Sequence, residues 1–415
     1  MIEDFYDLIV IGGGAAGSMC ALTAGENNLR VLLIEPNYHL GKKLRITGKG
    51  RCNITNNCSV KNVVDNITDH GRFLYSALSR FSPEDVMNFF ESYGLKLKTE
   101  RGNRVFPVSD NANDVANLLE KLCRGCGVQF CHEHAIAILS EDNQITAVKT
   151  EGHLFKTKSA AVCTGGKSYP LTGSTGDGYR LAKMFGHSIV TPKASLVPIE
   201  CSSPYCAQLQ GLALKNVTVS LYEDNKIIFS ELGEMLFTHF GVSGPLILSA
   251  SAHIRKAADY FITIDLKPGL DEEKLDARIL RDFQKYINRT IQNALGDLLL
   301  HSLIIPILRE TDIPPDRPVN SITKEERNRL LHVIKRFPLQ VSALRPMEEA
   351  VVTAGGVNTE EVNPRTMESK LMKGLYFAGE VLDLDAYTGG YNLQIAWSTG
   401  RLAGLSIVKE VKEYE

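Results

Sequence analysis

The pattern of hydrophobic and polar positions at the start of the chain predicts a strand, a glycine turn, a helix and a second strand. Residues 8–11 are a continuous run of Leu, Ile and Val, which is typical of a buried strand. Residues 12–17 read GGGAAG, and the alanine-rich stretch that follows to about Glu26 has helical composition. Residues 30–34 form another apolar strand, which ends in Glu35. The order is strand, glycine turn, helix, strand and acid.

Helical and extended patterns continue to alternate through the first half of the chain. Ser82-Pro83-Glu84-Asp85 is a favourable helix start, because it combines a capping serine, a proline in the first turn and acidic residues. We expect helices over 74–93 and 113–123, a hairpin from 128–139 and 144–150, and a strand over 160–163.

The pattern changes after about residue 190. Short alternating strands run from 196 to 266, a charged helical stretch covers 271–338, and the glycine-rich style of the start returns from about Glu349. The sequence therefore predicts an α/β fold with a Rossmann-type nucleotide-binding domain made from both chain ends, residues 1–190 and 346–415. An insert domain at 191–345 interrupts it, β-rich over 191–270 and helical over 271–345.

Composition and charge exclude several classes of protein. The 415 residues include 46 Lys and Arg against 48 Asp and Glu, giving a net charge of −2, and 44% are hydrophobic. These values argue against disorder and membrane bundles, and they provide no general attraction to nucleic acid or anionic lipid. The longest apolar run, 298–308, is interrupted by His301 and Pro306 and is too short to span a bilayer.

The cysteines and the N-terminus indicate a cytoplasmic, reducing compartment. Nine cysteines in a chain of this size are an odd number and do not suggest a disulfide framework. Residues 1–4 are acidic at positions 3 and 4 and lead straight into a strand, so we expect no secretory segment. Cys131 and His132 would face opposite ways on a regular strand, so we expect no metal site around Cys123, Cys126 and these residues.

The chemistry of the N-terminal motif is that of a dinucleotide site. Gly12 permits a tight turn, Gly14 lets the backbone approach a pyrophosphate, and Gly17 allows close packing of the helix on the strand. The helix start offers N–H groups and a positive dipole to the phosphates. Glu35, which ends the second strand, is placed to hold a pair of ribose hydroxyls.

A matching motif lies near the other end. A strand over 374–379 runs into Glu380, an acceptor for a polyol hydroxyl, and Gly389-Gly390-Tyr391-Asn392 opens a helix through about Val408. The dipole of such a helix start favours the negative charge of a reduced flavin ring.

Several longer motifs resemble one family. They are residues 12–17, 40–56 (LGKKLRITGKGRCNITN), 164–170, 173–178, 236–245, 354–357 and 374–400. Together they resemble bacterial FAD-dependent oxidoreductases related to the glutathione-reductase-like flavoproteins and named aminoacetone-oxidase-like or 3-dehydro-bile-acid reductase-like. The resemblance runs nearly end to end. It implies FAD bound across the composite domain, with the insert domain covering the flavin.

The resemblance also implies which residues bind FAD. The adenosine and pyrophosphate half of FAD is expected to be bound by Gly12, Gly14, Ala15, Ala16 and Glu35, with the backbone of Ala135 or Ile136 near the adenine. Lys43, Arg51 and Asn53 line the pyrophosphate and flavin edge, and Thr164 and Gly165 belong to the same set. The ribityl and isoalloxazine groups are expected to be bound by Gly379, Glu380, Gly390, Asn392, Leu393 and Gln394, with Asp383 or Asp385 as alternatives to Glu380.

Two further clusters each allow two interpretations. Cys52 and Cys58 could form a redox pair, but five residues separate them instead of the usual four and Asn56-Asn57 suggests a turn, so buried thiols are favoured. The basic residues between 42 and 51 could neutralise the FAD phosphates or bind a polyanion such as RNA. Without interleaved aromatic residues or an overall basic balance, the first interpretation is favoured.

The main hypothesis for the reaction is reduction of a C=C bond conjugated to a carbonyl in a small molecule. Because no second GxGxxG motif occurs, NAD(P)H would dock transiently as electron donor. Candidate acids are His239 and Tyr391, with Arg51 polarising the carbonyl. The alternatives are an amine or aminoketone oxidase that uses O₂, an RNA-modifying flavoenzyme acting on a uracil, and a flavin-binding sensor. Nothing indicates an obligate protein partner or a membrane.

Overall fold

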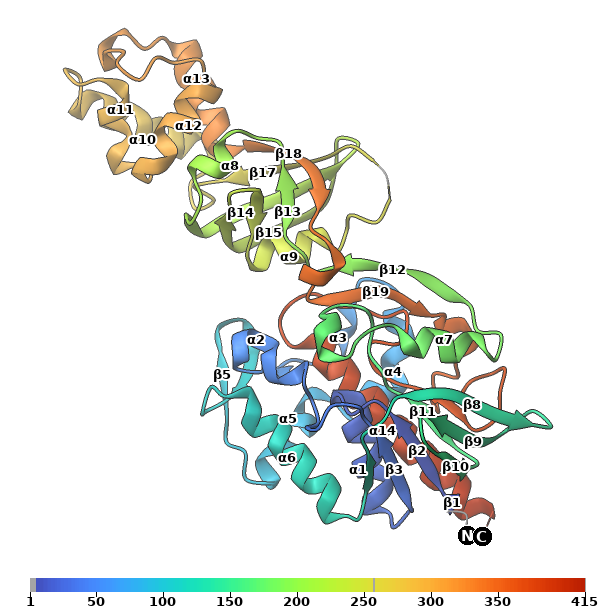
Figure 1. Ribbon diagram of the computed structural model, residues 1–415. Helices are drawn as coiled ribbons and strands as arrows, with labels where there is room; N and C mark the ends of the chain where they lie inside the picture. Colours follow the sequence, from blue (N-terminus) through green and yellow to red (C-terminus); the bar gives the residue numbers. More distant parts are fainter. Residues whose placement is uncertain (1–4, 257, 415) are drawn as a thin grey trace. The chain divides into compact units, whose positions relative to one another are not determined.

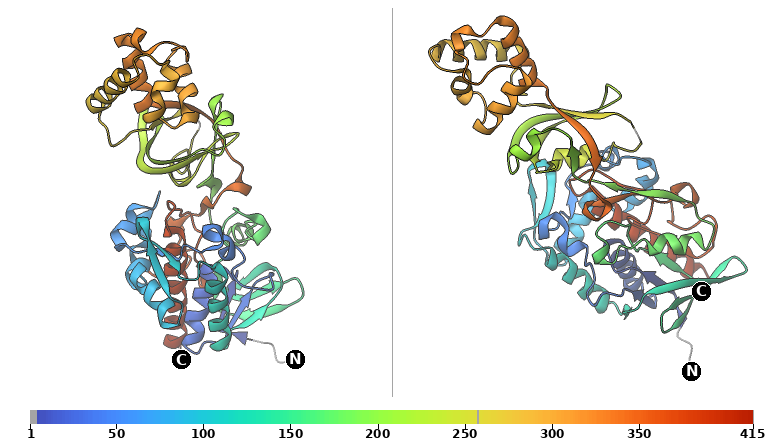
Figure 2. Two further views of the ribbon diagram at one scale, coloured as in Figure 1. Left: turned by 90° about the vertical axis from the view of Figure 1, so that its left-hand side faces the viewer. Right: turned by 45° about the horizontal axis from the view of Figure 1, so that its top comes forward.

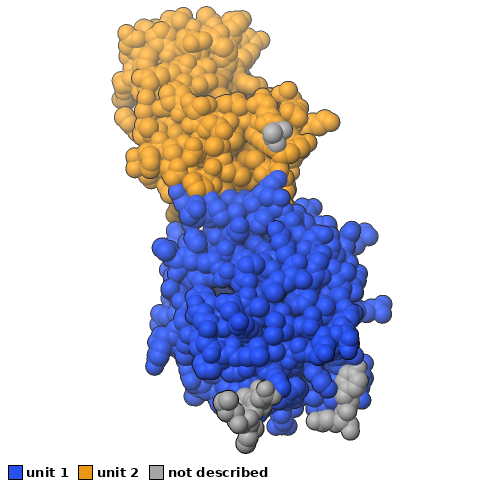
Figure 3. All heavy atoms as spheres, turned by 45° about the vertical axis from the view of Figure 1, so that its right-hand side comes forward, with its two compact units in different colours: residues 1–195, 347–415 blue, residues 196–346 orange. Residues whose placement is uncertain are grey.

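A computed structural model describes residues 5–256 and 258–414 (Figure 1). The acidic N-terminal residues 1–4 lie outside the described residues. The chain divides into two compact units, which Figure 3 colours separately. Unit 1 comprises residues 1–195 and 347–415, and unit 2 comprises residues 196–346.

A parallel sheet of five strands lies at the centre of unit 1. Its order is β20 (Leu375–Phe377), β11 (Ala160–Val162), β2 (Leu8–Ile11), β3 (Val31–Ile34) and β7 (Gln129–Cys131). Neighbouring strands pair in parallel throughout. Strands β2, β3, β11 and β20 are buried along their whole length, which is why their sequences are continuous apolar runs.

Two long helices pack together against this sheet. Helix α1 (Ala15–Glu26) follows the glycine turn, and α14 (Tyr391–Tyr414) follows Gly390. They lie side by side in Figure 1 and Figure 2. Glycine permits this approach, because a Cβ at Gly400 would lie 2.2 Å from the carbonyl oxygen of Ala16. The first and last segments of the chain are thereby joined in one domain.

Further strands of unit 1 form three smaller sheets. One is β1 (Phe5–Tyr6), β10 (Leu154–Thr157), β9 (Gln144–Thr150) and β8 (Ala135–Glu141). The second is β4 (Thr55–Asn56), β6 (Arg104–Pro107) and β5 (Leu97–Glu100), and the third pairs β12 (Ile189–Ser195) with β19 (Val352–Val357).

The predicted hairpin of 128–139 and 144–150 is only half correct. Strands β8 and β9 do form a hairpin, but residues 129–131 are a separate strand, β7, that pairs in parallel with β3. A short apolar run carries no signal of its partner, since strand pairing depends on packing between distant segments.

The predicted helical stretch of 74–93 is interrupted at Phe81. Helix α4 (Tyr75–Arg80) ends there, and α5 (Pro83–Ser92) begins with a capping box between Ser82 and Asp85. The other helices of unit 1 are α2 (Thr47–Gly50), α3 (Val60–Asp65), α6 (Ala112–Gly125) and α7 (Asp177–Lys183).

Unit 2 is a closed antiparallel barrel that carries a group of helices. The barrel order is β13 (Ile199–Cys201), β16 (Gly241–Ser243), β15 (Lys226–Phe237), β14 (Ala213–Glu223), β17 (Tyr260–Asp265) and β18 (Phe337–Leu344). Two of its helices are α8 (Tyr205–Gln208) and α9 (Pro245–Ser251). Between β17 and β18 lie α10 (Glu272–Lys285), α11 (Ile291–Ala294), α12 (His301–Glu310) and α13 (Lys324–Lys335). These four gather at one end of the barrel (Figure 2).

Among the described residues, no helix combines the length and apolar character that crossing a membrane would require.

Candidate active site

The glycine turn between β2 and α1 leaves an open space at one position only. A Cβ at Gly12, whose φ is +103°, would lie 2.6 Å from the carbonyl oxygen of Cys163, and one at Gly17 would lie 1.8 Å from that of Gly12. A Cβ at Gly14 would meet nothing within 4 Å, and no side chain caps the helix there. The turn is therefore tight on the protein side and open at the helix start, as a bound pyrophosphate requires.

Glu35 lies beside this turn and is held in a fixed orientation. Its Oε2 accepts a hydrogen bond from the backbone N–H of Gly13 at 2.8 Å. Its Oε1 accepts from the backbone N–H and the side-chain Nδ2 of Asn37, at 2.9 and 2.6 Å. The carboxylate is thus oriented at the end of β3, where the sequence predicts a contact with ribose.

The carbonyl groups predicted to lie near the adenine have a protein partner. The guanidinium of Arg180, on α7, donates to the carbonyl oxygens of Ile136 and Ala135, at 2.6 and 3.4 Å. Sequence reasoning missed Arg180, because nothing in the local pattern of α7 relates it to β8.

A network of polar side chains joins three distant segments at the other motif. Lys43 Nζ lies 2.7 Å from Glu380 Oε2 and 2.6 Å from Ser168 Oγ. Glu380 Oε1 accepts from the backbone N–H of Thr353 at 2.9 Å and from Ser168 Oγ at 3.0 Å. The structure therefore brings two predicted residues, Lys43 and Glu380, into direct contact. It adds Ser168, which lies in the 164–170 motif, and Thr353, which no sequence motif indicates.

Arg51 is held by carboxylates. Its guanidinium forms ion pairs with Glu100 and Asp110, and it lies over the ring of Phe106 at 4.1 Å. Hydrogen bonds to Glu100 and Asp110 raise the pKa of Arg51 above its ordinary value. The hydrogen bond from Arg51 lowers the pKa of Glu100, and those from Lys98 and Arg51 lower that of Asp110. Glu100 and Asp110 together offset the positive charge of Arg51. The role of Arg51 on a substrate carbonyl stays a prediction.

Two predicted FAD residues carry a buried polar atom without a partner among the described residues. They are Asn53, through Oδ1, and Thr164, through Oγ1. Leaving such an atom unpaired costs about 1–3 kcal/mol, so native proteins usually satisfy it with a ligand or water. With the open space at Gly14 and the oriented carboxylate of Glu35, these atoms fit a bound FAD.

The side chains that follow Gly390 are engaged within the protein. Asn392 bonds the backbone N–H and carbonyl of Ala386, at 3.0 and 2.7 Å. Gln394 Oε1 accepts from Thr55 Oγ1 at 2.6 Å, and Leu393 packs against an apolar cluster. A contact of these residues with FAD stays a prediction.

The two aspartates predicted as alternatives to Glu380 differ in their surroundings. Asp385 is buried and accepts from the hydroxyls of Thr68 and Ser195, each at 2.7 Å. Asp383 Oδ2 lies 3.6 Å from His70 Nε2. Asp385 is therefore bonded to two hydroxyls within the protein, whereas Asp383 lies beside a partly exposed histidine. A contact of either aspartate with FAD stays a prediction.

The three predicted catalytic residues lie in both units. Tyr391 is the first residue of α14, and Arg51 also belongs to unit 1. His239 is an exposed residue of unit 2, between β15 and β16, with its ring edge-on to Phe240 at 5.0 Å. Their catalytic roles stay predictions.

The cysteines are all free thiols, so Cys52 and Cys58 form no disulfide. Cys52 is fully buried, and burial raises its pKa to about 12. Over the described ranges, no group of three or more His, Cys, Asp and Glu is arranged to hold a metal ion.

A family model described as "HI0933-like protein Rossmann domain" matches residues 6–406. The chain belongs to this family. It is a flavin-dependent oxidoreductase with a Rossmann-type FAD domain, as the motifs at both chain ends predicted.

Two relatives match almost the whole length of this chain. The "Ribosomal RNA dihydrouridine synthase" of Escherichia coli (strain K12) is 30% identical over 95% of this chain and 96% of its own. The "3-dehydro-bile acid delta(4,6)-reductase" of Clostridium scindens is 30% identical over 95% and 97%. A solved 3-ketosteroid-delta4-(5alpha)-dehydrogenase from Rhodococcus jostii RHA1 has a TM-score of 0.51 at 13% identity, over 98% of this chain and 97% of its own. That structure supports the fold alone.

Proposed function

We propose that this flavoprotein reduces a C=C bond conjugated to a carbonyl in a small molecule, with NAD(P)H as the electron donor. The observation that carries the proposal is the shared chemistry in the names of two relatives that match end to end. A dihydrouridine synthase saturates the C5=C6 bond of uracil, which is conjugated to the C4 carbonyl. A 3-dehydro-bile acid delta(4,6)-reductase acts on double bonds conjugated to the C3 ketone.

The residues at the two glycine motifs supply the binding functions. Gly14 and the start of α1 receive the pyrophosphate, Glu35 the ribose, and the start of α14 the flavin end. When bound, FAD supplies hydride transfer to the β-carbon of the substrate. Lys43 and Glu380 form an ion pair at this end of the domain.

A proton donor for the α-carbon and a group that polarises the carbonyl complete the chemistry. Tyr391 and His239 are the candidate proton donors, and Arg51, whose guanidinium also bonds Glu100 and Asp110, is the candidate to polarise the carbonyl. The free thiols are compatible with a reducing, cytoplasmic compartment, which is part of this proposal.

A second candidate substrate is a uracil in RNA, which the name of the E. coli relative favours. The contacts of the basic loop weigh against it. Lys43 pairs with Glu380, and Arg51 with Glu100 and Asp110, which reduces the positive charge available to a polyanion. We therefore propose a small-molecule enone, and not RNA, as the first candidate substrate. No observation favours an amine oxidase.

Anaerobic mixing of the FAD-loaded protein tests the proposal. We expect NADH or NADPH to bleach the flavin absorption band, and a cyclic enone added afterwards to restore it. If a uridine-containing ribosomal RNA fragment restores the flavin band and the enone does not, the substrate is RNA and not a small molecule. Rapid bleaching by an amine and not by either nicotinamide would contradict the reductase.

Substitutions separate the two candidate acids. Tyr391→Phe and His239→Gln each remove one transferable proton and are expected to slow the substrate step without slowing flavin reduction by the nicotinamide. The variant with the larger loss of rate in the substrate step identifies the proton donor. If both variants keep the wild-type rate, neither residue is the donor.

A further inference from the structure

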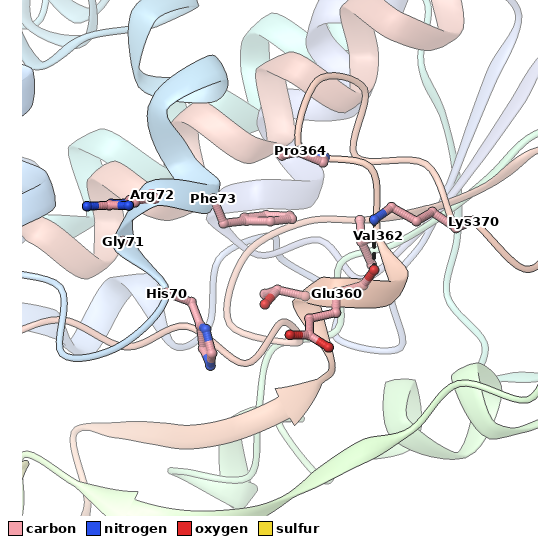
Figure 4. Close-up of a pocket in the computed structure, with 9 residues that line it drawn as sticks. His70, Gly71, Arg72, Phe73, Glu360, Val362, Pro364 and Lys370 are labelled. Carbon is pink, nitrogen blue, oxygen red and sulfur yellow. Dashed lines mark hydrogen bonds between the residues drawn. The ribbon is translucent and has the colours of Figure 1, made fainter.

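A pocket of about 510 Å³ in unit 1 has no part in the binding functions described above. Two segments form it, residues 70–73 and residues 359–370. Figure 4 shows Phe73, His70 and Glu360 around one space, with the Lys370 ammonium on the Glu360 side and Arg72 pointing away.

The groups around this space form a mixed set. Phe73, Val362 and Pro364 provide an aromatic ring and an apolar surface. His70 and Lys370 provide N–H donors, and Glu360 provides a carboxylate acceptor. A planar base can stack on an aromatic ring, a carboxylate accepts from ribose hydroxyls, and an ammonium binds phosphate. The set therefore fits a nucleoside diphosphate better than a purely apolar or purely anionic ligand.

One wall of the pocket is fixed by a buried histidine. His187 lies 3.1 Å through Nδ1 from Glu361 Oε2 and 2.7 Å through Nε2 from Ser369 Oγ. Burial lowers the pKa of His187, so the neutral ring donates through Nδ1 and accepts the Ser369 hydroxyl proton through Nε2. Glu361 also accepts from the backbone N–H of Ser188 at 2.8 Å.

These bonds tie the loop of residues 359–370 at both of its ends. Within the loop, Lys370 Nζ donates to the carbonyl oxygen of Glu360 at 2.8 Å, which places the ammonium at the rim and leaves two of its N–H groups for a ligand. A wall that is ordered in advance loses little entropy when a ligand binds.

The pocket adjoins the loop of the C-terminal glycine motif. His70 Nε2 lies 3.6 Å from Asp383 Oδ2, and Asp383 follows Glu380 by three residues. A nucleotide held here would border the segment that we assign to the flavin end. The chain also carries no second glycine fingerprint for a nicotinamide donor, so a donor site has to be built from other groups.

We infer that this pocket docks the adenosine diphosphate half of the reduced nicotinamide donor. Phe73 stacks on the adenine, Glu360 accepts from the ribose hydroxyls, and Lys370 with His70 binds the diphosphate. This inference rests on the proposed function, because it takes a nicotinamide as the reductant.

Rapid anaerobic mixing of the FAD-loaded protein with increasing NADH measures the dissociation constant of the donor. Lys370→Ala removes an exposed ammonium, and we expect the dissociation constant to rise about tenfold. Phe73→Ala is expected to weaken binding by a similar factor. Lys121→Ala, which removes an exposed lysine of α6 outside the pocket, is the matched control and is expected to behave as wild type.

ADP serves as a direct probe of the pocket. We expect it to compete with NADH in the wild type and to lose its affinity in Lys370→Ala, with both measured by calorimetry. If NADH reduces the wild type and the dissociation constant is unchanged in both pocket variants, the pocket is not the donor site, and the proposed function is unaffected. If neither NADH nor NADPH reduces the wild-type flavin, the proposed function is wrong, and the assignment of the pocket as a donor site fails with it.

Discussion

At the scale of single residues, the partners of charged side chains decide what those side chains can do. The sequence shows a dense basic loop, and the interpretation of such a loop depends on its neighbours. Lys43 meets Glu380, which is 337 positions away, and Arg51 meets Glu100 and Asp110. A count of charges marks this loop as a potential polyanion site, whereas the ion pairs of Lys43 and Arg51 offset part of its positive charge.

A residue-scale prediction concerns Cys52. Since burial raises its pKa to about 12, the thiolate is nearly absent at neutral and mildly alkaline pH. We expect iodoacetamide to leave Cys52 unmodified in the native protein and to modify the partly exposed Cys58 first. Reactivity should appear only as the pH rises towards 12, where the stability that the protonated thiol contributes is also lost.

Mass spectrometry of the alkylated peptides measures this order. Protein unfolded in guanidinium is the control, in which both thiols react. A Cys52→Ser variant that can no longer be reduced by NAD(P)H, while it still binds FAD, would revive the dithiol interpretation.

At the scale of elements, the strand–turn–helix unit is the part that local pattern specifies best. The glycines, the helix start and the acid after the second strand lie within 24 residues, from Gly12 to Glu35. Their roles follow from backbone geometry, which each short segment largely determines. Strand β7 shows the opposite case, because its three residues could join either the neighbouring hairpin or the central sheet.

Two glycine substitutions in this unit separate binding from folding. Gly14 has φ of −76° and open space around a Cβ, so Gly14→Ala should leave the unfolding temperature unchanged while FAD affinity falls about tenfold or more. Gly17→Ala would place a Cβ 1.8 Å from the Gly12 carbonyl oxygen and should destabilise the fold by more than ~2 kcal/mol. Thermal unfolding and flavin fluorescence titration measure the two effects. Equal losses of stability in both variants would contradict the assignment.

At the scale of the whole molecule, the chain joins a two-ended Rossmann unit to a barrel with appended helices. The alternating pattern of 196–266 indicates strands with one buried face, as in β17. Closure of the barrel requires β18, which lies beyond about 70 residues of intervening helical sequence. The net charge of −2 belongs to this scale too, because it governs long-range attraction to RNA.

The charge predicts weak binding to RNA. With a net charge of −2, we expect ribosomal RNA fragments to bind no more tightly than about 10⁻⁶ M at physiological salt, as measured by filter binding. Tighter binding that falls steeply with salt would favour the uracil substrate. In that case a Lys42→Ala, Lys49→Ala double variant, which removes exposed lysines of the loop, should reduce the salt dependence.

The amino-acid sequence is enough to predict most of the helices and strands, the two glycine motifs, the acids after their strands and the insertion. Each of these is a local pattern, in which neighbouring residues fix the backbone or the buried face. The Lys43–Glu380 contact, the carboxylates around Arg51, the closed barrel and the pocket between residues 70–73 and 359–370 could be found only in the folded molecule. These features join residues from distant segments, and their partners are selected by packing of the whole chain.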